Sequence, residues 1–262
     1  QQNWEHWLMT TARWREILTY DPRPATGCSP KEILWTKNKA QLYHYQCSSE
    51  RRYRTPVLMI YALINRPYVL DLTPGSSLVE YLVNEGFDVY LLDWGEFEWE
   101  DRDITYADLV YDYIATAARK VARSAGAKEI SIIGYCMGGT MSTLYAALFD
   151  RPVLKNLVYL AAPIDFNRAG TYDVWLKAPG YDPDRIADTM ELVPKSFIDW
   201  GTRMLNPMAN YWGTYTRLWK TLEEGKSVHF WKVLNKWSSD NINFPGGAYR
   251  DWIRDFYQGN KL

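Results

Sequence analysis

Four apolar runs alternate with helical patterns between residues 56 and 163, and this alternation limits the fold more than any other feature of the sequence. The runs are PVLMIYA (56–62), FDVYLLD (87–93), EISIIG (129–134) and KNLVYLAAP (155–163). Between them lie amphipathic patterns at 77–86, 105–126 and 138–149, and the first two of these end at a glycine. Because continuous apolar runs are typical of strands buried on both faces, we predict an α/β fold with a parallel sheet covered by helices on both sides.

The segments on either side of this core have other patterns. Residues 4–19 predict an amphipathic helix, and residues 33–45 predict two short strands around a Lys-Asn-Lys turn. Residues 164–262 are rich in Trp, Tyr, Asn and Pro and hold short helical patterns, as at 227–237 and 248–257. We therefore divide one composite domain into an N-terminal helix and hairpin (1–54), a core (55–165) and a helical cap or lid (166–262).

Composition narrows the function class. The net charge of the 262 residues is −1, so no basic surface for nucleic acid is indicated. No stretch has the length and apolarity of a membrane span or a signal peptide. Cys28, Cys47 and Cys136 are widely spaced and odd in number, which argues against a disulfide framework or a zinc site. We expect a cytoplasmic protein that holds no metal.

A glycine-flanked cysteine stands between the third strand and the helix that follows it. In Gly134-Tyr135-Cys136-Met137-Gly138, the cysteine occupies the place of serine in the G-x-S-x-G nucleophile elbow. The flanking glycines fit a turn where strand and helix backbones approach closely. A sulfur at a helix N-terminus is expected to have a lowered pKa. A buried, inert cysteine is the alternative, and we assign that structural role to Cys28 and Cys47.

The elbow geometry also predicts two groups that stabilise an oxyanion. The backbone N–H of Met137 points toward the same side as the Cys136 sulfur, and a second donor should come from the loop after the first buried strand, for which we choose the N–H of Ile64. A thiol suits acyl transfer from a thioester, because the acyl-cysteine keeps the acyl group activated for a second nucleophile.

The segments 55–95, GYCMGGT (134–140) and FPGGAYRDWIRDFYQGNKL (244–262) resemble the polyhydroxyalkanoate synthases, and most closely the catalytic subunits of the two-component Bacillus type. The resemblance implies an α/β-hydrolase core with a cap and an enzyme that needs no cofactor. Its implied substrate is an (R)-3-hydroxyacyl-coenzyme A, most often 3-hydroxybutyryl-coenzyme A, which is polymerised into polyester with release of coenzyme A. It also implies an accessory synthase subunit, an oligomer, and a location at the surface of polyester granules. Cys136 then corresponds to the family nucleophile.

The histidine and aspartate of that family are missing from the sequence. The resemblance places both after the nucleophile, in RDH-like and GGH-like stretches, and neither stretch occurs here. We interpret the chain as a synthase core and cap, truncated at the C-terminus, with an open sheet edge, poor activity on its own and a tendency to associate. His6, His44 and His229 are weak candidates for the base, and we favour structural hydrogen-bonding roles for Asp93 and Asp165.

Two rival functions remain open from the sequence alone. A thiol-dependent hydrolase, such as an esterase or thioesterase, would share the elbow and release a free acid. A non-catalytic scaffold would explain the missing acid and base. Arg51, Arg52 and Arg54 could meet coenzyme A phosphates, although a solvated turn explains the same cluster.

Overall fold

The computed structural model describes residues 4, 12, 26–46, 52–150, 152–223 and 228–262. The predicted N-terminal helix over 4–19 lies almost entirely outside the described residues, as does Cys47. Among the described residues, no helix combines the length and the apolarity that crossing a membrane requires.

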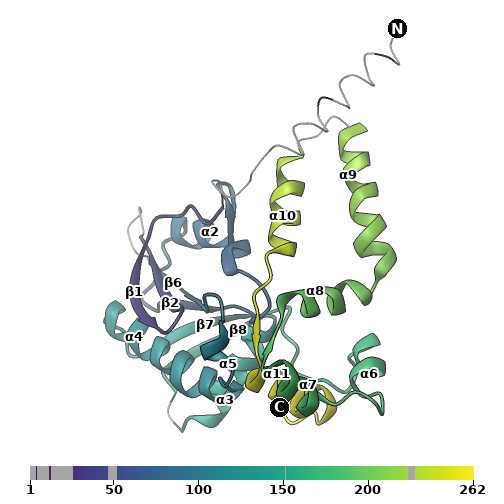
Figure 1. Cartoon of the computed structure of the whole chain (residues 1–262). Helices are drawn as coiled ribbons and strands as arrows, with labels where there is room; N and C mark the ends of the chain where they lie inside the picture. The colour runs from purple at the N-terminus through teal and green to yellow at the C-terminus, as the bar shows by residue number, and fades with distance from the viewer. Residues whose placement is uncertain (1–3, 5–11, 13–25, 47–51, 151, 224–227) are drawn as a thin grey trace.

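A six-stranded sheet forms the centre of the molecule (Figure 1). Its order is β1-β2-β6-β3-β7-β8, and β3, β6, β7 and β8 are parallel, as the four apolar runs predicted. The strands are β1 (Lys31–Lys37), β2 (Ala40–Tyr45), β3 (Val57–Ile60), β6 (Val89–Asp93), β7 (Ile130–Tyr135) and β8 (Leu154–Leu160). Leu58, Met59 and Ile60 of β3 are fully buried, which fits the central place of this strand.

The predicted hairpin is present, but it is not separate from the core. Strands β1 and β2 pair with each other, and β2 then pairs antiparallel with β6, with Leu42 opposite Leu92. The sheet is therefore mixed rather than purely parallel. The hairpin adds its strands because Ala40, Leu42 and Tyr45 bury their side chains in the same core as β6.

Helices cover both faces of the sheet, and Figure 1 shows α2 above it and α4 and α5 below it. Helix α2 begins where the Ser77 side chain accepts a hydrogen bond from the Glu80 N–H, and α4 ends at Gly126, which has a left-handed φ of 63°. The bounds are α2 (Leu78–Asn84), α3 (Tyr106–Asp108), the π-helix η4 (Leu109–Ile114), α4 (Ala115–Ala125) and α5 (Met137–Leu148). Short elements between them are η2 (Pro67–Leu70), β4 (Asp71–Thr73), β5 (Ser76–Ser77) and η3 (Trp99–Asp101).

The cap after residue 166 is helical, as predicted, apart from a two-residue strand pair. Helices α9 and α10 rise away from the sheet in Figure 1, and their far ends share a small apolar cluster of Leu218, Leu222 and Val228. The bounds are α6 (Thr171–Leu176), α7 (Pro183–Met190), β9 (Leu192–Val193), α8 (Lys195–Met204), the π-helix η5 (Met208–Gly213), α9 (Thr214–Glu223), α10 (His229–Ser239), β10 (Phe244–Pro245), α11 (Gly246–Asp251) and the π-helix η6 (Trp252–Gln258).

Strand β8 lies at one edge of the sheet, where an open edge was expected. Its outer side pairs with no other strand among the described residues. Val158 and Tyr159 are 44% and 41% exposed, whereas the residues of the central strand β3 are buried.

Candidate active site

The cysteine turn has the geometry of a nucleophile elbow. Cys136 stands directly between β7 and α5 and adopts φ 51° and ψ −124°, a backbone conformation that is strained for a residue with a side chain. Its N–H donates to the Leu160 carbonyl at 2.9 Å, and its carbonyl accepts from the Gly139 N–H at 2.9 Å. The strand on one side and the helix on the other therefore fix the turn.

The glycines around Cys136 are required by close backbone contacts. A Cβ on Gly134 would collide with the backbone of Gly139, and a Cβ on Gly138 would collide with the Ile60 carbonyl oxygen. Neither obstacle is the end of a flexible side chain, so neither could move aside cheaply. This is the physical reason for the glycines that the sequence motif predicted.

The two predicted oxyanion donors lie on different elements, Met137 at the start of α5 and Ile64 on the loop after β3. The Met137 N–H hydrogen-bonds the Cys136 sulfur. Ile64 follows β3, and its carbonyl accepts from the Ile242 N–H at 2.9 Å, which ties this loop to the cap. The role of both N–H groups in an oxyanion hole stays a prediction.

The expected direction of the Cys136 pKa is wrong. Burial of the thiol raises its pKa, and the hydrogen bond from the Met137 N–H lowers it only in part. Loss of water around a thiolate outweighs one backbone donor, because the charged form carries the desolvation penalty. At neutral pH the group is a thiol, which has to lose its proton before it can attack an acyl group.

Five buried or partly buried tyrosines from different parts of the chain interact electrostatically with the Cys136 sulfur, and the sequence analysis did not find them. Burial is the main cause that raises the pKa of each hydroxyl, and the nearby Cys136 sulfur contributes in every case. They are Tyr61, Tyr106, Tyr135, Tyr172 and Tyr257. At neutral pH these phenols are protonated and can donate hydrogen bonds. Among the described residues, the buried Tyr106 hydroxyl has no hydrogen-bond partner.

An apolar cavity of about 100 Å³ adjoins this group. Ile64, the predicted oxyanion donor, and Tyr172, one of the five tyrosines, are among the residues that line it. Trp175 and Trp200 line it as well, and Trp200 is 59% exposed to solvent. The cavity is therefore formed by the loop after β3 and by helices of the cap, and its lining suits an aliphatic group.

The histidines do not form a base for the thiol among the described residues. His44 Nε2 lies 2.8 Å from Asp88 Oδ1, and the ring stacks on Tyr90 near the start of β6, whereas the elbow follows the end of β7. His229 is the first residue of α10, and His6 lies outside the described residues. Within the described part of the chain, burial and the Met137 N–H are the causes that shift the pKa of Cys136, and no imidazole contributes.

The two candidate carboxylates have local hydrogen bonds. Asp93 accepts from the Gly95 N–H at 3.0 Å, and burial raises its pKa. Asp165 accepts from the backbone and the side-chain amide of Asn167, each at 3.0 Å. These contacts fit the structural roles that we favoured for both residues.

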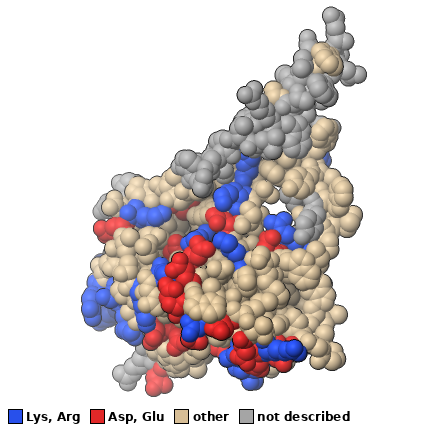
Figure 2. Space-filling view, viewed as in Figure 1, with Lys and Arg blue, Asp and Glu red and all other residues tan. Residues whose placement is uncertain are grey.

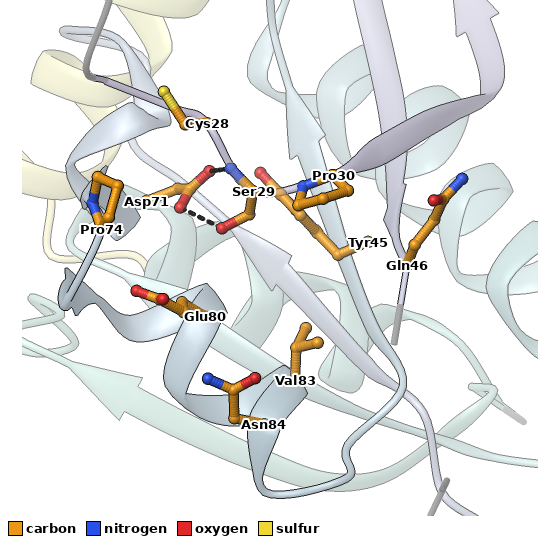
Figure 3. A pocket seen from close by; sticks show the side chains of 10 residues that line it. All are labelled: Cys28, Ser29, Pro30, Tyr45, Gln46, Asp71, Pro74, Glu80, Val83 and Asn84. Atoms are coloured by element: carbon orange, nitrogen blue, oxygen red, sulfur yellow. Dashed lines mark hydrogen bonds between the residues drawn. The ribbon is translucent and has the colours of Figure 1, made fainter. Parts of the chain in front are cut away.

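A second pocket, of about 260 Å³, lies at the N-terminal end of the described core (Figure 3). Cys28 is at its rim, and the buried Asp71 carboxylate accepts hydrogen bonds from Ser29 and from the Ser77 hydroxyl. Because these contacts satisfy Asp71, the pocket holds a structural polar cluster. Within the described ranges, no group of three or more His, Cys, Asp and Glu is placed to hold a metal ion.

Two family models match the chain. One is described as the alpha/beta hydrolase fold and covers residues 55–215, and the other is the N-terminus of poly-beta-hydroxybutyrate polymerase (PhaC) and covers residues 25–82. The first spans β3 to the beginning of α9, and the second spans the hairpin and β3 to α2. Both agree with the observed sheet and with the fold class predicted from the sequence.

Similar proteins carry the name poly(3-hydroxyalkanoate) polymerase subunit PhaC. The one from Haloferax mediterranei is 40% identical over 91% of this chain, the one from Synechocystis is 36% identical over 90%, and the one from Allochromatium vinosum is 32% identical over 90%. The chain spans 48%, 64% and 66% of these proteins, respectively. Among solved structures, a probable hydrolytic enzyme from Pseudomonas aeruginosa is 16% identical with a TM-score of 0.48, covering 89% of this chain and 68% of that one.

Proposed function

This chain belongs to the α/β-hydrolase fold family and is a homologue of the polyhydroxyalkanoate synthase subunits, and from that premise we propose that Cys136 is the acyl-carrying nucleophile of such a synthase. The protein would polymerise (R)-3-hydroxyacyl-coenzyme A, with 3-hydroxybutyryl-coenzyme A as the first substrate to test. The observation that carries the proposal is a cysteine, rather than a serine, at the strained position of the elbow.

The first half-reaction forms an acyl-cysteine. The Cys136 thiol loses its proton, and the sulfur attacks the thioester carbonyl carbon. The N–H groups of Met137 and Ile64 would stabilise the oxyanion of the tetrahedral intermediate. The bond from carbon to the coenzyme A sulfur then breaks, and coenzyme A leaves as a thiol after taking up a proton. One thioester is exchanged for another, so the acyl group stays activated.

The second half-reaction forms the ester. A 3-hydroxyl group attacks the acyl-cysteine carbonyl, its proton passes to a base, and the Cys136 sulfur leaves and is reprotonated. We propose that this chain does not supply that base, in keeping with the absence of a described imidazole or carboxylate that affects the thiol. Without a general base, a rate loss of about 10²–10⁴ is expected.

The buried thiol favours one rival function, a scaffold that does not catalyse. Its raised pKa and the lack of a described base are what an inert cysteine would show. The proposed accessory subunit, the oligomer and the position at granule surfaces belong to the same proposal and depend on the family resemblance.

Mass spectrometry of the chain after incubation with 3-hydroxybutyryl-coenzyme A distinguishes these functions. We expect slow addition of one hydroxybutyryl group to Cys136, with equal release of coenzyme A, and none in Cys136→Ala. The Allochromatium vinosum relative serves as the rate standard. Free 3-hydroxybutyrate as the sole product would support a hydrolase, and a chain that stays unmodified at high pH would support the scaffold.

A further inference from the structure

An uncharged aromatic surface lies on the outside of the cap. Residues 204–216, MLNPMANYWGTYT, contain no Asp, Glu, Lys or Arg. Met208, Trp212 and Tyr215 are 70%, 69% and 60% exposed, at spacings of four and three along the continuous helix formed by η5 and α9. Figure 2 shows the right-hand flank of the molecule as mostly tan, with few charged side chains on the side seen in this view. We call Trp200, Met208, Trp212 and Tyr215 the aromatic strip.

The aromatic strip shares one residue with the apolar cavity. Trp200 is 59% exposed and also lines the cavity, together with Ile64 and Tyr172. An aliphatic chain in this cavity would therefore contact the strip at Trp200. Among the described residues, no charged side chain lines the cavity.

The size of the aromatic strip helps to identify what it contacts. Four side chains with 59–70% of their surface exposed present on the order of 500 Å² in total. This is less than the roughly 800 Å² per partner of a standard protein interface. A patch of this size is nevertheless as large as the apolar patches that mark functional contacts on monomers.

The lack of basic side chains in residues 204–216 argues against an anionic membrane as the partner of the aromatic strip. Binding to an anionic bilayer uses Lys and Arg beside the apolar side chains. Arg203 and Arg217 flank residues 204–216 in the sequence, and Arg203 is paired with Asp199. Since no Lys or Arg occurs between them, the exposed side chains of this segment are matched to an apolar surface that carries no charge. Aliphatic polyester is such a surface, and the ester oxygens can accept hydrogen bonds from the indole N–H and phenol O–H groups of the strip.

We propose that the aromatic strip is the face by which this protein contacts the surface of its polyester product. The inference rests on the proposed function, since that function supplies the polyester. It adds which part of the chain makes the contact and places Trp200, which also lines the cavity, at the polymer surface.

The test is binding of the 262-residue chain to surfactant-free particles of poly(3-hydroxybutyrate), measured by co-sedimentation. The triple variant Met208→Ser, Trp212→Ser, Tyr215→Ser is expected to bind at least tenfold more weakly than the unchanged chain. A matched control replaces Ile33, Tyr81 and Trp99, which are 54–61% exposed on other elements, by serine. The control is expected to bind as the unchanged chain does. Circular dichroism shows that each variant is folded, and Trp212→Phe alone should retain binding.

Three results would overturn this inference. They are equal binding by the triple variant, equal loss in the control variant, and preferential binding of the strip to phosphatidylcholine or phosphatidylglycerol vesicles. A dimer that the triple variant abolishes, with polyester binding unchanged, would assign the strip to a second copy of the chain. Binding needs no turnover, so Cys136→Ala should bind normally. Failure of acyl transfer and failure of polyester binding are therefore separate outcomes.

Discussion

Replacing Cys136 by glycine should give a more stable protein than replacing it by alanine. Elsewhere in a helix or strand, glycine is less stable than alanine by about 0.5–1 kcal/mol, because it loses more backbone freedom on folding. At Cys136 the backbone has φ 51° and ψ −124°. A residue with a Cβ in such a conformation is strained by about 1–3 kcal/mol, whereas glycine adopts it without that penalty.

The loss of backbone freedom favours alanine and the backbone strain favours glycine, and the strain is the larger of the two free energies. We therefore expect Cys136→Gly to exceed Cys136→Ala by about 0.5–2 kcal/mol in free energy of unfolding. Both variants lack the sulfur, so the comparison does not depend on the chemistry of the thiol. For a chain of this size, each kcal/mol corresponds to a shift of roughly 2–4 °C in Tm.

Urea unfolding monitored by tryptophan fluorescence measures the difference, since the chain has 13 tryptophans. Ala147→Gly is the matched control, because Ala147 is an exposed residue of the same helix, α5. This control should lose about 0.5–1 kcal/mol. If Cys136→Ala proved as stable as Cys136→Gly or more stable, the elbow would not be strained and the reasoning would fail.

Three further predictions concern the thiol, a histidine and a glycine. Burial raises the Cys136 pKa, so iodoacetamide should modify Cys136 more slowly at neutral pH than it modifies the exposed Cys28, and the rate at Cys136 should rise with pH. Peptide mass spectrometry measures both rates, and faster modification of Cys136 would contradict the burial argument. The hydrogen bond between the His44 side chain and the Asp88 carboxylate is the main cause that raises the His44 pKa above 6.5. The stabilisation from protonated His44 should therefore be complete below pH 6.5 and disappear as the pH rises through the folded-state pKa. Urea titrations from about pH 5 to 9 should show this loss of stability, and His44→Gln should not show it. Gly138→Ala would press a methyl group against the backbone of β3 and should lower the free energy of unfolding by about 1–3 kcal/mol. Gly180→Ala is the control, because a methyl group there meets open space. Equal urea midpoints for the two variants would refute the close contact at Gly138.

The core was predictable because its signals are local. Each buried strand is a continuous apolar run, and the run at 87–93 became β6 at Val89–Asp93. Glycines mark helix ends, as at Gly126 after α4. The elbow was also local, since its glycines and cysteine lie within five consecutive residues.

The features that escaped prediction depend on residues far apart in the chain. The hairpin joins the sheet through β6, about 50 residues later, and no short pattern indicates that pairing. The Cys136 pKa has the opposite direction to the one expected because distant segments bury the sulfur. Tyrosines from β7, α3, α6 and η6 interact electrostatically with it, and their positions along the sequence do not indicate this.

The close contacts at the elbow separate the positions that tolerate no added atom from the position whose side chain can be exchanged. Gly134 and Gly138 have no room for even one added carbon, because backbone atoms occupy the space. Cys136 differs from these glycines because it already carries a side chain, and serine at this position keeps the Cβ and replaces only the sulfur by oxygen. Cys136→Ser would therefore compare a thiol with an alcohol in the same setting, so that a difference in acyl-transfer rate could be assigned to the atom alone.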